Sequence, residues 1–455
     1  MRSAFSVPAS TGGAALEGFR ERAASRLLEE RPDGVRWRGE LSSSALSTAT
    51  AACALELRRR ALGADAGGGS RRLVESALDW LATHQNEDGG WGDTTDSPSN
   101  PSTTVLAWVA LGLKPRSSGE RSRSVERAEA WIRRRIGSLE GRELGRAIVG
   151  AYGEDRTFSV PILTMAALGG RLGDGRDAWG VVEALPFELA ALPHHWLHRV
   201  GLPMVSYALP ALIAIGQVRH HRRPPRNPLV RWIRDATRRR TLAVLERIQP
   251  SSGGFLEAAP LTSFVGMSLV GAGRPRHPVV ERAAGFLEST VRDDGSWPID
   301  TDLSIWLTTL AVNALAAGGR LDAHLGEGER AALLDWLLAR QHLDEHPYTA
   351  AAPGGWAWTD ASGGVPDADD TAGALLALWS LASKTGSGEV PDAELRERAA
   401  LGVGWLLDLQ NRDGGIPTFC RGWGRLPFDR SSPDLTAHAL RAWHCWRREL
   451  GGELG

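Results

Sequence analysis

The sequence predicts an all-α protein built from stacked helical hairpins, and two patterns indicate this. One unit keeps returning along the chain: an amphipathic helix, a Gly-rich turn closed by an apolar side chain, and a second helix rich in Ala and Leu. Tryptophan is unusually common, with 18 Trp against 3 Tyr and 9 Phe, and several Trp recur in these turns. Recurrent helix pairs form a solenoid or a closed toroid, because each pair buries its apolar face against the next.

Composition narrows the class of protein. The chain has 455 residues, enough for two domains, and its 53 Lys and Arg balance 54 Asp and Glu. No global basic field therefore argues for nucleic acid as a partner. Cys53, Cys420 and Cys445 form no CxxC pair, so a disulfide framework or a structural zinc site is not expected and a reducing cytoplasm fits. The N-terminus lacks the apolar core of a signal peptide.

The expected helices follow one another in a clear order. A polar arm leads into a helix at Ala14–Glu30, a turn at Pro32–Gly34, a helix at Ser42–Leu57 and a linker at Gly63–Gly69. The copies of the repeat follow, and they pair Ala77–Trp91 with Thr103–Leu113, Leu245–Phe255 with Leu261–Val270, Phe286–Trp297 with Leu303–Ala316, and Gly404–Ile416 with Asp434–Trp446.

The turns have a local physical explanation. Their glycines allow positive φ after a helix end, and an Asp supports the turn through its own backbone. A Gln stands six residues before the closing side chain in every copy except the third, which has Val291. We expect its amide to bond freed backbone groups. Trp91 and Phe255 are therefore interpreted as staples of their turns rather than as catalytic side chains.

One stretch between the first two copies is less regular. Residues 200–218 carry no charge and include Pro203 and Pro210. The length suits a membrane span, but the two prolines and the surrounding repeats favour a buried core helix. An arginine-rich segment follows, comprising Arg219, Arg222, Arg223, Arg226, Arg231, Arg234 and Arg238–Arg240. Such a charge run is usually a solvated face, and beside Trp232 it could also rest on an anionic membrane surface.

A cluster of acids precedes one of the Ala/Leu-rich helices. Asp367, Asp369 and Asp370 fall within four positions. At a helix start, such acids can cap free N–H groups and face the positive end of the helix dipole. Trp356 and Trp358 lie just upstream. Because apolar aromatic surroundings can keep a carboxylic acid protonated, the cluster also predicts proton chemistry.

These motifs together resemble the squalene–hopene cyclases, which are class II triterpene cyclases. The likeness rests on the Gln-x-x-x-Gly-Gly-aromatic turns, on Asp-Ala-Asp-Asp-Thr-Ala at 367–372 after Gly-Gly-Trp-Ala-Trp, and on Ser-Pro-Asp-Leu-Thr-Ala-His at 432–438. It implies that Asp369 is the proton donor, that Asp367 and Asp370 flank it, and that His438 bonds and reprotonates it. Asp434 lies one helical turn before His438.

The resemblance also implies aromatic residues that line a substrate cavity and stabilise cations. They fall on Trp358, Trp297, Trp356 and, more weakly, Phe158. A lone helix histidine is usually structural, and Trp297 and Trp358 could equally be turn staples. No Asp-Asp-x-x-Asp motif accompanies the acids, so neither a metal site nor a cofactor is expected.

The fold that the resemblance implies is two α/α barrels, the first inserted into the second. We accordingly expect residues 1–62 to pack on the catalytic domain, 63–320 to form the inserted barrel and 321–455 to form a partial catalytic barrel. About three hairpins can be counted for a barrel that needs six. A truncated or split product, a second subunit that completes the wall, or an open arc would each account for this count.

The implied reaction is cyclisation of a linear, squalene-like isoprenoid in triterpenoid or hopanoid biosynthesis. One acid among like charges stays protonated near neutral pH, and indole faces stabilise the cation by about 0.5–2 kcal/mol each. Two alternatives remain. The first is a class II cyclase for a shorter prenyl diphosphate. The second is a non-catalytic toroid that binds isoprenoids or partner proteins. Protein prenyltransferase β-subunits share the barrel, but their zinc ligands are not recognisable here.

Overall fold

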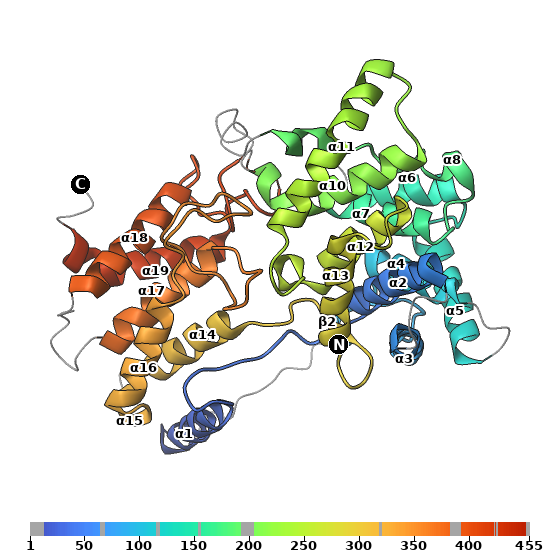
Figure 1. Ribbon diagram of the computed structural model, residues 1–455. Helices are drawn as coiled ribbons and strands as arrows, with labels where there is room; N and C mark the ends of the chain where they lie inside the picture. The colour runs from blue at the N-terminus through green and yellow to red at the C-terminus, as the bar shows by residue number, and fades with distance from the viewer. Residues whose placement is uncertain are drawn as a thin grey trace.

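The computed structural model describes residues 13–63, 69–114, 119–152, 156–192, 204–317, 321–382, 393–422, 424 and 426–451. These residues form two helical domains that lie side by side (Figure 1). The all-α class and the hairpin architecture predicted from the sequence are confirmed. Two short strands, β1 (Ser43–Ser44) and β2 (Trp297–Pro298), pair antiparallel between the domains' connecting segments.

The first domain is a closed ring of inner helices. Each inner helix packs on the next, and the last packs back on the first. In this order they are α2 (Ala45–Leu62), α4 (Pro101–Leu113), α7 (Arg156–Leu168), α10 (Met204–Arg222) and α12 (Ala259–Gly271). Their side chains are largely buried and form two core clusters, of which the second contains residues of α10 and α12.

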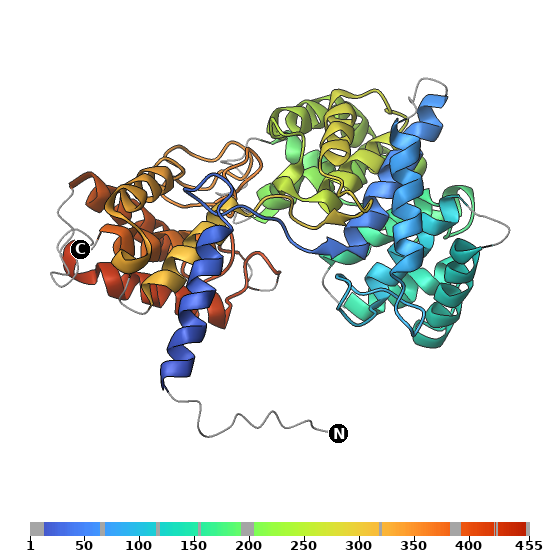
Figure 2. The same ribbon diagram turned by 90° about the horizontal axis from the view of Figure 1, so that it is seen from below.

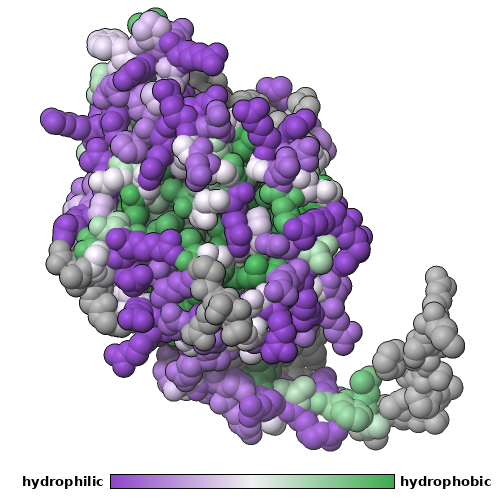
Figure 3. All heavy atoms as spheres, turned by 90° about the vertical axis from the view of Figure 1, so that its right-hand side faces the viewer, coloured by the Kyte–Doolittle hydropathy of each residue, from purple (hydrophilic) through white to green (hydrophobic). Residues whose placement is uncertain are grey.

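Outer helices surround this ring. They are α3 (Gly69–Thr83), α5 (Glu120–Arg135), α6 (Gly141–Tyr152), α11 (Pro228–Ile248) and α13 (Pro278–Ser289), with the short elements α8 (Gly175–Ala178), η2 (Phe187–Ala191) and η3 (Phe255–Glu257). Figure 3 shows the end of this domain that faces away from the second domain, with hydrophilic residues at the rim around an apolar centre. The rim is hydrophilic because each outer helix buries one face against the inner helices and exposes its polar face to solvent.

The second domain is an open arc. Its inner helices are α14 (Ser304–Ala316), α17 (Ala368–Ala382) and α19 (Pro433–Leu450), and its outer helices are α1 (Gly13–Glu29), α16 (Glu327–Leu338) and α18 (Ala393–Leu409), with the short α15 (Leu321–His324). Helix α17 packs between α14 and α19. Leu310 on α14 and Leu440 on α19 are exposed at the two edges. The described residues of this domain thus form half a ring.

Two inner helices pack in a domain other than the expected one. Residues 1–62 were expected to pack on the catalytic domain; α1 does so, but α2 packs in the core of the first ring. Helix α14 falls within the expected inserted barrel, yet it packs against α17. The reason is a double crossing, in which the chain leaves the second domain after α1 (Figure 2) and returns after β2. At the crossing, Ser44 pairs with Trp297.

Because of the crossing, two turns contact inner helices that do not follow them directly in the sequence. The Trp37 turn follows α1, and its backbone N–H donates to the Thr308 hydroxyl on α14 at 3.2 Å. The Trp297 turn follows α13, and its backbone N–H donates to Thr48 on α2 at 3.0 Å. The predicted pairing of Phe286–Trp297 with Leu303–Ala316 was therefore wrong. Each domain contains one hairpin whose two helices come from distant parts of the chain.

The predicted staples are confirmed in the turns. The indole N–H of Trp91 donates to the Leu81 carbonyl at 2.9 Å, and Gln85 donates to the Gly89 carbonyl at 2.8 Å. Every closing residue also donates its backbone N–H to a threonine hydroxyl at the start of an inner helix. These pairs are Trp37–Thr308, Trp91–Thr104, Phe255–Thr262, Trp297–Thr48, Trp356–Thr371 and Ile416–Thr436.

The uncharged run at 200–218 gives a core helix, as we expected for its described part. Tyr207, Leu209, Ile213 and Val218 of α10 are buried, and Pro210 lies inside the helix. Residues 200–203, which include Pro203, lie outside the described part. Among the described helices, none combines the length and the apolar character needed to cross a membrane.

Candidate active site

The acidic cluster begins helix α17 and is fixed there by backbone contacts. Asp367 donates its N–H to the Trp356 carbonyl at 3.0 Å, and Ala368 donates to the Thr418 carbonyl at 2.9 Å. The Asp367 Oδ1 atom accepts the N–H of Asp370 at 2.9 Å, which is the capping contact that the sequence suggested. The helix start is thus held between the Trp356 turn and the segment after the Ile416 turn.

Asp367 and Asp370 are buried. Burial is the largest cause that raises their pKa values, and it raises the pKa of Asp367 to about 7 and that of Asp370 well above its ordinary value. The neighbouring acids act in the same direction by charge repulsion. This pair therefore holds at least one proton near neutral pH.

Asp369 points away from this pair and is bound by two other helices. Its Oδ1 atom lies 2.7 Å from His438 Nδ1 on α19, and its Oδ2 atom accepts the indole N–H of Trp306 on α14 at 3.2 Å. The Asp369 side chain is 40 % exposed, whereas that of His438 is 16 % exposed. Asp369 is thus an accessible carboxyl group with an indole donor at one oxygen and an imidazole nitrogen at the other.

A close approach of three inner helices creates this arrangement. A Cβ atom on Gly373, one turn after Asp369, would lie 3.1 Å from Thr309 Oγ1 and 3.5 Å from His438 Cε1. The Gly373 carbonyl accepts the side-chain N–H of Asn313 at 3.2 Å. A larger residue at position 373 would push the imidazole away from the carboxyl group. Gly373 therefore lets α14 and α19 supply the two donors to Asp369.

Of the predicted aromatic residues, Trp358 contacts the start of α14, the helix that supplies Trp306 to the acid. Its carbonyl accepts the N–H groups of Ile305 and Trp306 at 3.0 and 3.1 Å. Its ring meets Phe419 edge-on at 6.3 Å between centroids. Trp358 and Phe419 belong to an aromatic cluster between the two domains, whose other members are Tyr207, Tyr348 and Phe428.

The other predicted site residues lie elsewhere. Trp297 is buried in the first domain and donates to the Leu287 carbonyl at 2.9 Å, and Trp356 donates to the Leu337 carbonyl at 2.8 Å, so both staple turns. Phe158 is exposed on α7, beside Tyr152. Asp434 is exposed and accepts the Ser432 hydroxyl, so the predicted spacing to His438 does not bring it to Asp369.

Sequence reasoning missed Trp306 and Phe419. Trp306 belongs to the first turn of an inner helix, as Asp369 does. Because neighbouring inner helices begin at the same end of the domain, a large aromatic residue in that turn was a usable signal. Phe419 follows the Ile416 turn in a segment without helical periodicity, where the sequence gives no signal. Among the described residues, no group of three His, Cys, Asp or Glu could hold a metal ion.

Comparison with known proteins identifies two family models along the chain. The squalene–hopene cyclase N-terminal domain matches residues 21–166, and the squalene–hopene cyclase C-terminal domain matches residues 303–426. The squalene–hopene cyclase of Alicyclobacillus acidocaldarius is 27 % identical over 461 residues, covering 92 % of this chain and 66 % of that protein. The sporulenol synthase of Bacillus subtilis is 30 % identical over 183 residues, covering 39 % of this chain and 26 % of that protein.

The chain spans only part of the length of these relatives. Enfumafungin synthase from Hormonema carpetanum is 26 % identical over 441 residues, which cover 79 % of this chain and 30 % of that protein. Among solved structures, abietadiene synthase from Abies grandis aligns with a TM-score of 0.51 at 17 % identity, covering 96 % of this chain and 49 % of that one. That likeness supports the fold.

Proposed function

The chain belongs to the squalene–hopene cyclase family, and we propose on that premise that it is a class II terpene cyclase acting on a linear, squalene-like isoprenoid. Asp369 starts the reaction by protonating a terminal double bond. The observation that carries the proposal is the environment of Asp369, an accessible carboxyl group with His438 and Trp306 as donors and two buried acids behind it. No diphosphate leaves in this reaction.

Protonation of an alkene is favoured when the conjugate base of the acid is stabilised. The proton leaves Asp369 as the π electrons form a new C–H bond, and the positive charge stays on the more substituted carbon. The resulting carboxylate accepts N–H groups from His438 and Trp306, and such charge-assisted bonds are roughly twice as strong as neutral ones. The two donors thus stabilise the carboxylate that the proton transfer leaves behind.

The buried pair behind Asp369 has a supporting role. Because Asp367 and Asp370 share at least one proton near neutral pH, they place less negative charge beside Asp369 than two carboxylates would. Two negative charges in the pair would oppose the formation of a carboxylate at position 369 during the transfer. Partial neutrality of the pair lowers that cost. Asp367 also fixes the position of α17 by capping it.

The aromatic cluster around Trp358, whose backbone is bonded to the start of α14, suits a carbocation. Trp358 and Phe419 present π faces and edges, and Tyr207 and Phe428 extend the cluster. Each aromatic face stabilises a desolvated cation by about 0.5–2 kcal/mol and is a poor nucleophile. The intermediate could therefore close rings before it loses a proton or meets water.

The test is product formation by the full chain. Squalene and geranylgeranyl diphosphate are supplied in separate reactions, and products are identified by gas chromatography with mass spectrometry. We expect cyclised product from squalene, and a drop of at least 10³-fold for Asp369→Asn with unchanged circular dichroism, because the amide has no acidic proton. Asp335→Asn, which changes an exposed acid on α16, is the matched control. Wild-type turnover by Asp369→Asn would contradict the proposal, and cyclisation of geranylgeranyl diphosphate alone would favour the diphosphate cyclase.

A peripheral membrane contact is also proposed, on α11. Leu229, Trp232 and Ile233 are exposed on one face of this helix, and Arg226 and Arg231 beside them are exposed as well. An isoprenoid substrate dissolves in the bilayer, so a bound enzyme would reach it directly. We expect co-sedimentation with vesicles containing anionic lipid to fall several-fold in the double variant Leu229→Ser, Trp232→Ser. Leu343→Ser, at an exposed leucine of the other domain, is the control, and equal loss in both would contradict this contact.

A further inference from the structure

In three of the turns, the Gln side chain donates a hydrogen bond to the backbone of the next outer helix. Gln85 donates to the Ser124 carbonyl on α5 at 2.9 Å, in addition to its contact within the turn. Two further pairs repeat this contact, Gln249 with the Val279 carbonyl on α13 at 3.1 Å and Gln341 with the Arg398 carbonyl on α18 at 2.9 Å. Each turn therefore joins its own hairpin to the outer helix of the following one.

A glycine of the same turn sits against the backbone of that helix. A Cβ atom on Gly89 would lie 2.8 Å from the Arg127 carbonyl, and one on Gly253 would lie 2.4 Å from the Arg282 carbonyl. In both cases the contact falls three residues after the carbonyl that accepts the Gln amide. The outer helix therefore packs on each turn in the same register. Its carbonyl bonded to the Gln precedes by three residues the carbonyl that contacts the glycine.

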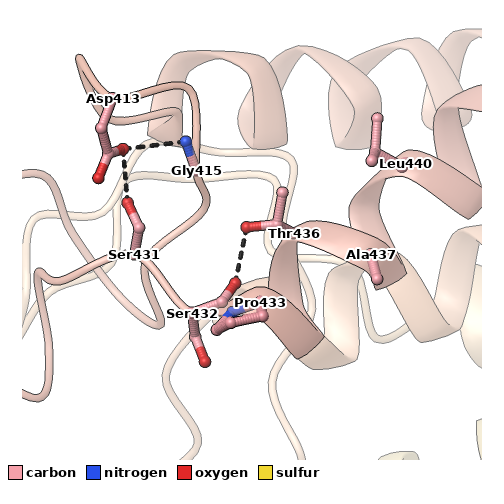
Figure 4. Close-up of a pocket in the computed structure, with 8 residues that line it drawn as sticks. All are labelled: Asp413, Gly415, Ser431, Ser432, Pro433, Thr436, Ala437 and Leu440. Carbon is pink, nitrogen blue, oxygen red and sulfur yellow. Dashed lines mark hydrogen bonds between the residues drawn. The ribbon is translucent and has the colours of Figure 1, made fainter.

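The last turn of the second domain also contains the Gln and the glycine, but no outer helix of the described residues packs on it. Gln410 donates to the Gly414 carbonyl at 2.9 Å and has no second contact among the described residues. A Cβ atom on Gly414 would meet nothing within 4 Å. Asp413 is exposed, bonded to the Gly415 N–H and the Ser431 hydroxyl. Figure 4 shows this turn beside the start of α19, where Leu440 and Thr436 help to line an open cleft of about 350 Å³.

The first domain shows which helix such a last turn receives. Its final turn, at Trp297, docks the first outer helix of the same ring, α3. The Trp80 indole on α3 donates to Asp294 Oδ2 at 3.0 Å, and Ser76 lies against Gly295. The ring closes through this contact. In the second domain, the first outer helix is α1, which packs at the opposite edge of the arc from the Gln410 turn.

Helix α1 has the register of a docked outer helix. The Trp37, Trp91 and Trp297 indoles each donate to a leucine carbonyl ten residues earlier, which aligns Leu27 with Leu81 and Leu287. Arg22 then corresponds to Arg282, whose guanidinium donates to Gln249 Oε1 at 2.7 Å and to the Glu246 carbonyl at 3.2 Å. In α1, Arg22 lies over its own Phe19 ring and bonds no turn among the described residues.

The same alignment places Arg26 where α3 has Trp80. Trp80 donates an N–H group to the acid of its turn, and a guanidinium can do the same for Asp413, with opposite charge in addition. Leu16 and Phe19 of α1 are 68 % and 61 % exposed, which leaves apolar area to be covered at this edge.

We propose that the Gln410–Ile416 turn receives helix α1 of a second copy of this chain, and that two copies close one ring of six hairpins head to tail. Gln410 then donates to the Phe19 carbonyl of the other copy, Gly414 meets its Arg22 carbonyl, and Asp413 pairs with its Arg26. Because each copy offers one empty turn and one undocked helix, a two-fold axis satisfies both. The second arc would then cover the Asp369 side of the first and exclude water.

The experiment measures the mass of the full chain by size-exclusion chromatography with light scattering, with circular dichroism as a check of folding. We expect twice the chain mass of 48.9 kDa. Asp413→Arg and Arg26→Asp each create a like-charge contact, so each should raise the dissociation constant of the dimer at least tenfold, while the double variant should restore it. Both side chains are exposed, so folding should not suffer.

Arg20→Asp is the matched control, since both arginines lie on α1 and pair with glutamates of their own helix, Arg20 with Glu17 and Glu21 and Arg26 with Glu29 and Glu30, but only Arg26 is aligned with Trp80. It should leave the dimer intact. A monomeric wild type, a dimer insensitive to both single variants, or a double variant that stays monomeric would overturn the proposal. The mass measurement is independent of the proposed cyclisation, so the two proposals can fail separately.

Discussion

The two domains use the same turn and differ in how the series of hairpins ends. In the first domain, the final turn docks α3 through Trp80 and Asp294, and the inner helices form a closed ring. In the second, the Gln410 turn has no docked helix among the described residues and Asp369 is part exposed. The difference teaches that the closed ring has an outer helix docked at its last turn, whereas the open arc has none there among its described residues.

The largest expected effect concerns the helix that closes the ring. Trp80→Ala removes a buried indole and its bond to Asp294, and we expect a loss of ~3–5 kcal/mol in the free energy of unfolding. Arg26→Ala changes the corresponding position of α1, where the side chain is exposed, and should stay within about 0.5 kcal/mol for the monomer. Urea unfolding followed by circular dichroism measures both. Equal losses would contradict the distinction between a docked and an undocked helix.

A matched pair of glycines gives the next effect. Gly253 and Gly414 have φ values of 88° and 85°, so alanine costs about 1–2 kcal/mol of backbone strain at either position. At Gly253, the new Cβ also meets the Arg282 carbonyl, which adds roughly 1–3 kcal/mol. Thermal unfolding of Gly253→Ala and Gly414→Ala should therefore differ by that second amount. In dilute protein, a Gly414→Ala variant as unstable as Gly253→Ala would show that its turn is already occupied.

The Gln side chains give a smaller difference of the same kind. Gln249→Ala removes one of the two acceptors of Arg282 and two amide contacts, which should cost about 1–3 kcal/mol. Gln410→Ala removes one exposed contact, and we expect a loss below about 1 kcal/mol. Chemical denaturation in dilute, monomeric protein compares them. The two variants should become more alike at concentrations where the proposed dimer forms.

The smallest effect is a pH dependence specific to the arc. The folded-state pKa of Asp367 is about 7 and that of Asp370 is raised, so the folded state binds more protons than the unfolded state above pH ~4. Stability from this pair is full below pH ~4 and is lost as the pH rises through about 7. Asp370→Asn should weaken this loss, by on the order of 1 kcal/mol between pH 5 and 8. Parallel stability profiles for wild type and variant would contradict the shared proton.

The sequence predicted much of the fold because each turn is a local device. Gln85, Gln249 and Gln410 stand at a fixed spacing from their closing residues. The Gln341–Trp356 turn was not recognised as a copy of the repeat because inserted residues stretch that spacing. The Trp37 turn was predicted as a turn but not as a copy of the repeat, because Arg31 replaces Gln. The packing of α2 and α14 was also not predictable from neighbouring residues, because their hairpins join distant segments across the β1–β2 crossing.

The sequence indicated the site residues that lie in continuous motifs. It did not indicate the residues that reach the site only through the packing of distant helices. Asp369 and His438 lie in continuous motifs, and the structure brings them within 2.7 Å. Trp306 reaches the acid only because α14 returns to the second domain, which local sequence does not reveal. Trp297 looks like a cavity aromatic residue in sequence, yet its indole staples a turn in the other domain.

The central claim is that the acid of the open arc works inside a completed ring, and the dependence of specific activity on protein concentration tests it most directly. Squalene cyclisation per unit of wild-type enzyme is measured across concentrations that span the dimer dissociation constant from light scattering. We predict that specific activity rises with the dimer fraction, and that Asp413→Arg shifts the rise to higher concentration. Constant specific activity from a monomeric chain would contradict the claim.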